Sequence, residues 1–222
     1  MEEMNFERAR FNMVEQQVRP WTVLDGDVLR VLRTLPREHF VPEMYRRLAY
    51  SDTRIPLGHG QSMMAPVVEG RMLQGLELHP DDQALEIGTG SGFLTAGLAQ
   101  LARSVESVDI YEDFTRTAGE RLRALDISNV TLATGDAAQG WENGRQYDAI
   151  VLTGAVPEVP ESYRYALRPG GRLIAIIGDR DRPIMEAVQI VRTGAEEWSS
   201  ESLLETWVEP LVNAARPARF QF

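Results

Sequence analysis

The sequence predicts an α/β protein with a doubly wound, mostly parallel sheet, a helical N-terminal extension and an antiparallel C-terminal hairpin. From about residue 82 onward, short apolar runs alternate with helix-like segments. The first of these runs leads directly into the glycine loop Gly-Thr-Gly-Ser-Gly, residues 88–92. Alternation of this kind is typical of a parallel sheet with helices on both faces.

The N-terminal third is expected to be helical and to end in a loop. Apolar residues at helical spacing predict one helix that ends at Pro20 and a second that ends at Pro36. A third helix is expected around Tyr45–Tyr50. Residues 53–66 are rich in glycine and are expected to be irregular or briefly extended. A further helix should then begin at Val67 and end near residue 76.

Five apolar runs are expected to form the parallel strands of the sheet. They are Ala84–Ile87, Ser104–Ile110, Val130–Ala133, Ala149–Thr153 and Leu173–Ile177. The helices between them are centred on Thr95, Thr117 and Tyr163, and two strands around Gly194 form the hairpin. We therefore predict a single domain, with residues 1–78 as extension and loop, 79–212 as the core and 213–222 as a peripheral tail.

Composition excludes several classes of function. The chain has 222 residues, 43% of them hydrophobic and 25% charged, as in soluble globular proteins. Its formal net charge of −10 argues against a nucleic-acid partner, because binding phosphates requires clustered cations. The absence of cysteine excludes disulfides and thiolate metal sites, and no metal site is predicted. The N-terminus is too charged for a secretory signal and no apolar run suits a membrane span, so a cytoplasmic location is expected.

The glycine loop indicates the class of cofactor. A dinucleotide fingerprint requires a glycine at its sixth position, but the residue there is Phe93. The third glycine is instead Gly92, after Gly88 and Gly90, and Glu86 precedes the turn. This spacing favours S-adenosyl-L-methionine, which has no pyrophosphate. Its carboxylate can approach N–H groups at the start of the helix, and nearby acids suit its ammonium and sulfonium charges.

Two further acids support this interpretation. Asp109 ends the second strand, where a carboxylate can accept both ribose hydroxyl protons. Asp136 follows the third strand and is placed to accept from the adenine amino group. Asp109 alone does not separate this cofactor from NAD, and each acid can also be a plain turn residue. The predicted cofactor-binding residues are Glu86, Gly88, Thr89, Gly90, Gly92, Asp109, Ile110, Asp136, Ala137 and Thr153.

With these residues in place, the chain resembles the protein-L-isoaspartate (D-aspartate) O-methyltransferases over roughly residues 18–212. The similar segments are LPREHFVPEMYRRLAYSDTRIPLGHGQ, LEIGTGSGFLTAGLA, GDAAQGW and YDAIVLTGAVPEVPESYRYALRPGGRLIAIIG. The resemblance implies a Rossmann-like methyltransferase fold with S-adenosyl-L-methionine as cofactor. It also implies methyl transfer to the α-carboxylate of isoaspartyl residues in damaged proteins or peptides, a protein-repair activity.

The loop that the resemblance assigns to the acceptor departs from the family pattern. The family carries Thr-x-Ser after its G-x-G-Q loop, whereas this chain has Ser62 and Met64 at those positions. A methionine makes the pocket more apolar, which predicts weaker binding of a peptide carboxylate. A carboxylate acceptor needs no general base, whereas a phenol, amine or alcohol would benefit from one, and His59 is the candidate. Ser62, Met64 and His59 are thus the predicted acceptor-site residues.

Two alternatives stay open at this point. One is a methyltransferase of the same fold that acts on a different, small-molecule acceptor. The other is a cofactor-binding protein without catalytic activity, because the acceptor loop lacks a family hydroxyl. A nicotinamide oxidoreductase is disfavoured by Phe93.

Overall fold

The computed structural model describes residues 5–179, 181 and 183–215, and a seven-stranded sheet forms its centre. The strand order is β5-β4-β3-β6-β7-β8-β9. The parallel strands are β3 (Gln83–Ile87), β4 (Ser104–Asp109), β5 (Val130–Thr134), β6 (Tyr147–Val156) and β7 (Leu167–Ile177). The antiparallel edge is formed by β8 (Met185–Arg192) and β9 (Trp198–Thr206). The predicted doubly wound sheet and its C-terminal hairpin are confirmed.

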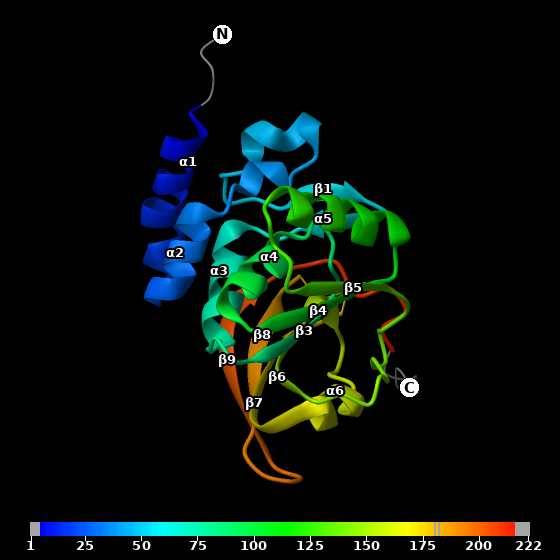
Figure 1. Cartoon of the computed structure of the whole chain (residues 1–222). Helices are drawn as coiled ribbons and strands as arrows, with labels where there is room; N and C mark the ends of the chain where they lie inside the picture. Colours follow the sequence, from blue (N-terminus) through cyan, green and yellow to red (C-terminus); the bar gives the residue numbers. More distant parts are fainter. Residues whose placement is uncertain (1–4, 180, 182, 216–222) are drawn as a thin grey trace.

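Helices cover both faces of this sheet (Figure 1). They are α3 (Pro66–Gly75), α4 (Phe93–Leu101), α5 (Glu112–Ala124) and α6 (Glu161–Ala166). Alternate residues of β6 join different apolar clusters, as expected for a strand buried on both sides. Val151 belongs to the cluster that contains residues of α3 and α4, whereas Ile150 belongs to the one that contains Tyr163 of α6.

The N-terminal extension packs outside α3 and α4 (Figure 1). The helix α1 (Phe6–Asn12) continues through π-helical and 3-10 turns to Trp21, so Pro20 lies in its last turn, as predicted. The second helix, α2 (Gly26–Thr34), begins where the Asp25 carboxylate accepts hydrogen bonds from two backbone N–H groups of the first turn.

Two segments differ from the sequence-based expectation, and the loop that was expected to be irregular or briefly extended is more ordered than expected. The third helix is a six-residue 3-10 helix over Glu43–Leu48, and Pro42 precedes it. Residues 53–66 contain a two-stranded hairpin, β1 (Ile55–Gly58) and β2 (Gln61–Met63). Strand β7 begins six residues earlier than predicted, because the Arg-Pro-Gly-Gly segment interrupts the pairing with β6 without ending the strand.

A buried cation ties the extension to the core. The Arg37 side chain is 0% exposed and its Nε donates to the carbonyl of Ala49 at 2.8 Å. One terminal nitrogen donates to the carbonyl of Met64 at 2.6 Å, and the other pairs with the buried Glu69 at the start of α3. The guanidinium also lies 4.6 Å from the ring of Phe93 in α4. Burying this charge requires several partners, and they fix the loop that precedes α3.

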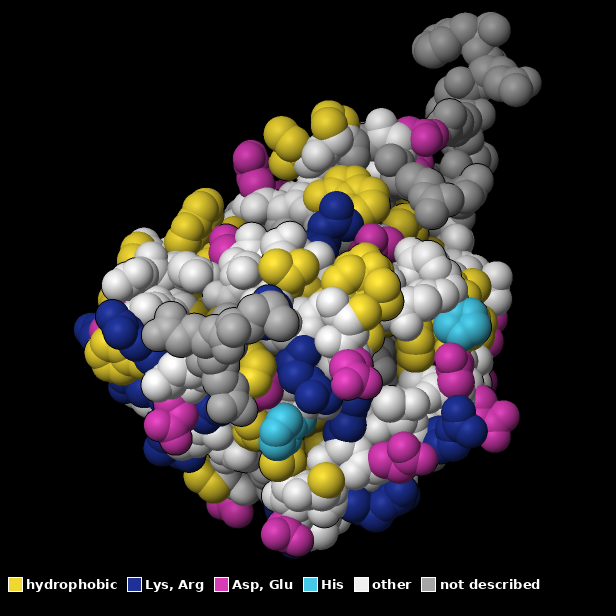
Figure 2. Space-filling view, turned by 90° about the horizontal axis from the view of Figure 1, so that it is seen from above, with side chains coloured by type: hydrophobic (Ala, Val, Ile, Leu, Met, Phe, Trp, Pro, Cys, Tyr) yellow, Lys and Arg dark blue, Asp and Glu magenta, His cyan; other side chains and the backbone are white. Residues whose placement is uncertain are grey.

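Charges of both signs intermix on the face seen from above (Figure 2). Arginine side chains there lie among acidic and hydrophobic ones, without an extended basic stripe. In the part of the chain that the structure describes, no helix combines the length and apolar character needed to span a bilayer.

Candidate functional site

We call the cavity at the carboxyl ends of β3, β4, β5 and β6 the main cavity, because most of the predicted site residues line it. Its empty volume is about 640 Å³, part of it open to solvent, which is within the usual range for ligand pockets. Ligands of open α/β sheets bind at this edge, where the strand order reverses, here between β3 and β6. The predicted site residues that line it are Ser62, Gly88, Gly90, Asp109, Ile110, Asp136, Ala137 and Thr153.

The first glycine of the loop is required by a close contact with β6. Gly88 has φ +99°, and a Cβ added there would lie 2.1 Å from Oγ1 of Thr153. That hydroxyl donates to the carbonyls of Ile87 at 3.0 Å and Gly88 at 2.8 Å. Thr153 thus holds the loop in place while lining the cavity, and a larger residue at position 88 would displace it.

Most of the loop's amides are used within the protein. The N–H of Gly88 donates to Val108 O, that of Gly90 to Asp109 Oδ2, that of Gly92 to Thr89 O and that of Phe93 to Ser91 Oγ. These four donors fix the conformation of the loop and are not free for an anion. A cofactor carboxylate at the start of the helix would therefore have to bind amides other than these four.

Gly92 has a packing role. It precedes α4 with φ +84°, and a Cβ there would lie 2.8 Å from the Cβ of Ala118 in α5. Gly92 does not line the main cavity, nor does it line a second, smaller cavity that adjoins the glycine loop. The next residue, Phe93, points to the extension, where its ring meets Phe40 edge-on at 5.5 Å. Gly92 therefore allows α4 and α5 to approach, and Phe93 fastens α4 to the N-terminal layer.

Asp109 joins the glycine loop to the end of β4. Its Oδ2 accepts from Gly90 N at 2.8 Å and its Oδ1 accepts from Tyr111 N at 3.0 Å. The side chain is 7% exposed, and burial raises its pKa above the ordinary value. A carboxylate offers about four lone-pair positions, so each oxygen can still accept from a ligand hydroxyl in the cavity.

Glu86 is a fully buried carboxyl group behind the loop. Its Oε2 accepts from the hydroxyls of Thr95 at 2.5 Å and Ser107 at 2.6 Å, and Ser107 in turn contacts Thr89 Oγ1 at 2.6 Å. Its Oε1 is buried without a hydrogen-bond partner among the described residues. Burial raises the pKa of Glu86 to about 8. An unpaired oxygen at a cavity wall is a position where a donor from a ligand is expected.

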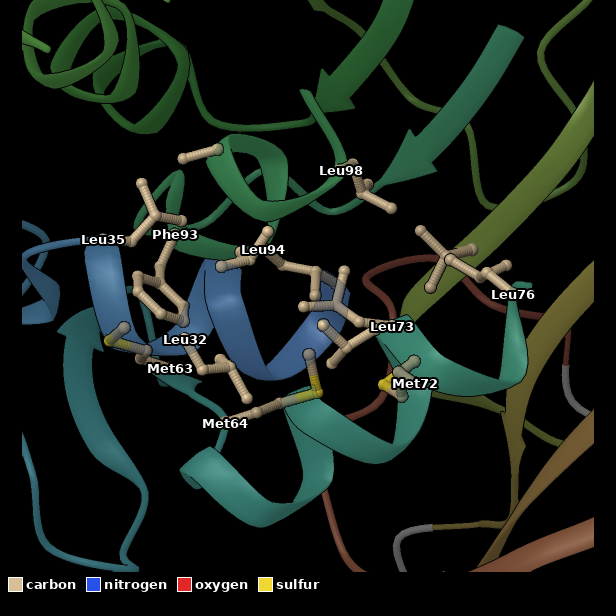
Figure 3. Packing of buried hydrophobic residues seen from close by; sticks show 14 of the residues in the cluster. Leu32, Leu35, Met63, Met64, Met72, Leu73, Leu76, Phe93, Leu94 and Leu98 are labelled. Atoms are coloured by element: carbon tan, nitrogen blue, oxygen red, sulfur yellow. The ribbon is translucent and has the colours of Figure 1, made fainter. Parts of the chain in front are cut away.

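A smaller cavity of about 330 Å³ continues from the main one toward Glu86. Ser62, Met64, Thr89 and Glu69 also line it. Ser62 and Met64 therefore share one cavity wall, although Met64 is only 6% exposed and belongs to the apolar cluster among α2, α3 and α4 (Figure 3). The methionine is both a core residue and part of the candidate acceptor site.

Asp136 lies at the far end of the main cavity. Its Oδ1 accepts from Ala138 N at 3.0 Å, and its Oδ2 accepts from Asn213 Nδ2 at 2.8 Å. Asn213 is the first residue of the segment that was expected to be peripheral, and it contacts this acid at the edge of the cavity. The C-terminal segment reaches this edge by pairing in parallel with the end of β6. Residues 216–222 of the predicted tail lie outside the described residues.

His59 occupies the tip of the β1–β2 hairpin, with φ +52°. Its ring stacks on Tyr111 with centroids 4.0 Å apart and planes inclined by 9°, and its Nε2 lies 3.0 Å from Asp113 Oδ2. That contact lowers the pKa of Asp113. His59 lines an outer cavity of about 1020 Å³ that shares Gln61 and Tyr111 with the main one. The structure thus places His59 at the rim, where it fastens the hairpin to α5.

Glu209 was not anticipated from the sequence. Its carboxylate lines the main cavity, accepts from Ser62 Oγ at 2.9 Å and pairs with Arg54 at 3.0 Å. The available signal was a single acid within the apolar run 207–212. No group of three or more His, Asp or Glu side chains in the described part of the chain has an arrangement suited to a metal ion.

The sequence matches a family of known enzymes. Residues 8–215 match the model of the protein-L-isoaspartate(D-aspartate) O-methyltransferase family. Protein-L-isoaspartate O-methyltransferase 1 of Rhodopseudomonas palustris is 38% identical over 94% of this chain and 84% of its own length. The protein-L-isoaspartate O-methyltransferase of Aliivibrio salmonicida is 37% identical over 92% of this chain and 97% of its own.

Solved structures share the fold. A protein-L-isoaspartate O-methyltransferase superposes with a TM-score of 0.79 at 22% identity, covering 92% of this chain and 66% of that one. A Plasmodium falciparum chain in complex with S-adenosyl-L-homocysteine, described as a candidate protein-L-isoaspartate O-methyltransferase, superposes with a TM-score of 0.77. It is 21% identical and covers 95% of this chain and 99% of its own.

Proposed function

This chain belongs to the protein-L-isoaspartate(D-aspartate) O-methyltransferase family of S-adenosyl-L-methionine-dependent enzymes, and from this premise we propose that it methylates the α-carboxylate of isoaspartyl residues. The observation that carries the proposal is the continuity of one cavity from Asp136 and Asp109 to Ser62 of the acceptor loop. A cofactor and an acceptor can therefore meet at the loop's glycines.

The residues of the cavity fit the cofactor. In this proposal Asp109 accepts from the ribose hydroxyls, and Asp136 accepts from the adenine amino group beside Ala137. The cofactor's ammonium faces the buried Oε1 of Glu86, which has no partner within the described part of the protein. Gly88 and Gly90 allow close approach to the main chain. All of these residues line one of the two cavities, and each of the three carboxylates has a lone pair left for a ligand.

The chemistry demands little from the protein beyond alignment. When bound, S-adenosyl-L-methionine supplies a methyl group on a sulfonium, and an acceptor oxygen bonds to that carbon as the carbon–sulfur bond breaks and its electron pair stays on sulfur. A carboxylate acceptor is ionised near neutral pH and brings its own electron pair, so no base is required. Ser62 and the hairpin would orient the acceptor, and the buried walls would exclude water.

Methyl-ester formation tests this proposal. The purified protein is incubated with labelled S-adenosyl-L-methionine and an isoaspartyl peptide, with the aspartyl peptide of the same sequence as control. We expect base-labile labelling of the isoaspartyl peptide alone. Label on a small molecule of a cell extract, with none on the peptide, would favour the alternative of a different acceptor. Binding of S-adenosyl-L-homocysteine without any transfer would favour a non-catalytic protein.

Two further statements about partners and location stay predictions. The net charge of −10 supports the absence of a nucleic-acid partner. A cytoplasmic location is predicted from the sequence and agrees with a substrate class of damaged proteins.

A further inference from the structure

Glu209 places a carboxylate in the wall of the main cavity, on the side of the acceptor loop. Its main chain is held at the end of β6, because Ala155 N donates to Glu209 O at 3.0 Å and Leu211 N donates to Ala155 O at 2.9 Å. Its side chain is 14% exposed and lines the same cavity as Ser62 and the glycine loop. The carboxylate is therefore a fixed part of the site.

One oxygen of Glu209 makes both of its contacts. Oε1 accepts from Ser62 Oγ at 2.9 Å and from Arg54 at 3.0 Å. Arg54 stacks over the ring of Trp207 at 4.3 Å and does not line the cavity, so it approaches the carboxylate from outside. Oε2 has no hydrogen-bond partner among the residues that the structure describes.

This arrangement sets the polarity of the pocket. A serine hydroxyl has one proton, and that of Ser62 is donated to Glu209. The hydroxyl therefore presents lone pairs to a ligand, and so does Oε2 of Glu209. Both groups attract an N–H donor, most strongly a charged one, because hydrogen bonds to ionised groups are the stronger kind.

The acceptor carries a nitrogen at the right place. In an isoaspartyl residue the α-nitrogen is bonded to the same carbon as the α-carboxylate, so a methylated carboxylate brings this nitrogen into the pocket. Within a chain the nitrogen is an amide with one N–H group. At a peptide's N-terminus it is an ammonium group with three N–H groups and a positive charge.

We propose that Glu209 and Ser62 bind the α-nitrogen of the acceptor and make the enzyme prefer isoaspartyl residues with a free α-ammonium group. This inference rests on the proposed isoaspartyl activity. It names Glu209 as a residue that determines specificity by touching the substrate. Carboxylate acceptors without a neighbouring donor are disfavoured by the same charge.

Two peptides test the proposal. Both begin with an isoaspartyl residue and have the same sequence, but one is acetylated at its N-terminus. At about pH 7 most of the free α-amino groups are protonated, since their pKa is about 8. We expect the native protein to show a kcat/KM about tenfold higher for the free peptide, the ratio expected for one charge-assisted hydrogen bond. The difference should lie mainly in KM.

Glu209→Gln and Glu205→Gln provide the matched pair of variants. Glu209→Gln removes the charge and keeps an oxygen for Ser62, so the preference for the free peptide should disappear. Glu205 is exposed on β9, and Glu205→Gln makes the same change of charge away from the cavity, so the preference should persist. Equal stabilisation of all three proteins by S-adenosyl-L-homocysteine shows that each is folded and binds the cofactor product.

The possible outcomes distinguish a failure of the role of Glu209 from a failure of the proposed isoaspartyl activity. Equal rates with both peptides in the native protein would overturn the inference and leave the isoaspartyl activity intact. A preference that survives in Glu209→Gln would also overturn it, because another group would then bind the nitrogen. If neither peptide is methylated although S-adenosyl-L-homocysteine binds, the proposed function fails and the inference fails with it.

Discussion

The burial of Glu86 makes the stability of the fold depend on pH. In the cofactor-free protein, burial raises its pKa from the ordinary 4.5 to about 8. The folded state therefore binds this proton more tightly than the unfolded state does. The stability that follows is fully present below pH 4.5 and is lost as the pH rises through about 8. An ammonium group beside Oε1 would stabilise the ionised form of Glu86 and would restore the stability that is lost at high pH.

Glu86→Gln should therefore stabilise the cofactor-free protein near pH 8 but weaken the binding of the cofactor product. Near pH 8 the cofactor-free variant should unfold at a higher temperature than the native protein, by about 2–4 °C for each kcal/mol gained. This advantage should shrink as the pH falls from 8 toward 5, because the carboxyl group of the folded protein is then protonated and as uncharged as the glutamine. Thermal unfolding across this pH range measures it.

The same variant should bind S-adenosyl-L-homocysteine about tenfold or more weakly, as expected for the loss of a charge-assisted hydrogen bond. Calorimetric titration of the native protein and the variant at one pH provides the comparison. Unchanged affinity, or a variant less stable than the native protein near pH 8, would contradict the assignment of Oε1 to the cofactor's ammonium.

Met64→Ser separates the two roles of this side chain. Because Met64 is buried in the core, its truncation should lower the free energy of unfolding by about 2–4 kcal/mol. The new hydroxyl should also add a donor to the smaller cavity and raise kcat/KM for isoaspartyl peptides. Met72→Ser is the control, since Met72 is 0% exposed in the same cluster and lines neither cavity near the loop. Equal activity in both variants would show that Met64 only packs.

Residues at strand ends were predictable, and residues fixed by distant partners were not. Asp109 and Asp136 each follow a parallel strand, and such strands end at one edge, so their common cavity followed from order along the chain. Glu209 meets Ser62 across 147 positions, and Arg37 meets Glu69 across 32. Neither pair belongs to a local pattern, so the contacts became visible only in three dimensions.

At the scale of elements, the β1–β2 hairpin forms one side of the site. Its tip is fastened to the start of α5 by His59, through the stack on Tyr111 and the contact with Asp113. These groups are about half exposed, so they contribute little to global stability. They instead determine how closely the hairpin covers the main cavity. Leu57 and Gln61 of the hairpin line this cavity.

His59→Asn should loosen the hairpin and leave the fold intact. Asparagine tolerates the positive φ of this position but removes the stacked ring. We expect faster hydrogen exchange over residues 57–62 and a higher KM for the peptide, with a change in unfolding free energy below about 1 kcal/mol. His79→Asn, in the turn before β3, is the control. Native exchange rates in His59→Asn would show that other contacts hold the hairpin.

Elements with a long, regular pattern were predicted most closely. The strands β3 to β6 and the helix α3 lie within a few residues of their expected positions, because their apolar periodicity agrees with their burial. The segment of β1 and β2 was expected to be irregular or briefly extended, and its pairing as a hairpin was not predicted, since the strands are only four and three residues long. The start of β7 was missed because Pro169 and two glycines resemble a turn.

On the scale of the whole molecule, three distant parts of the chain meet at one edge of the sheet. The N-terminal extension positions the acceptor loop through Arg37, the core supplies the strand-end acids, and the C-terminal segment adds Glu209 and Asn213. The fold class and the edge of the sheet at which the main cavity lies followed from the sequence. The closure of the site by the two ends of the chain did not, because it depends on tertiary pairing at the end of β6.

A crystal structure of the complex with S-adenosyl-L-homocysteine tests the central claim most directly. We predict that the ribose hydroxyls lie within about 2.7–3.2 Å of Asp109 and the adenine amino group within the same range of Asp136. We also predict that the ammonium lies beside Oε1 of Glu86 and that the sulfur faces the side of Ser62 and Glu209. A nucleoside bound elsewhere, or one with its sulfur directed away from Ser62 and Glu209, would contradict it.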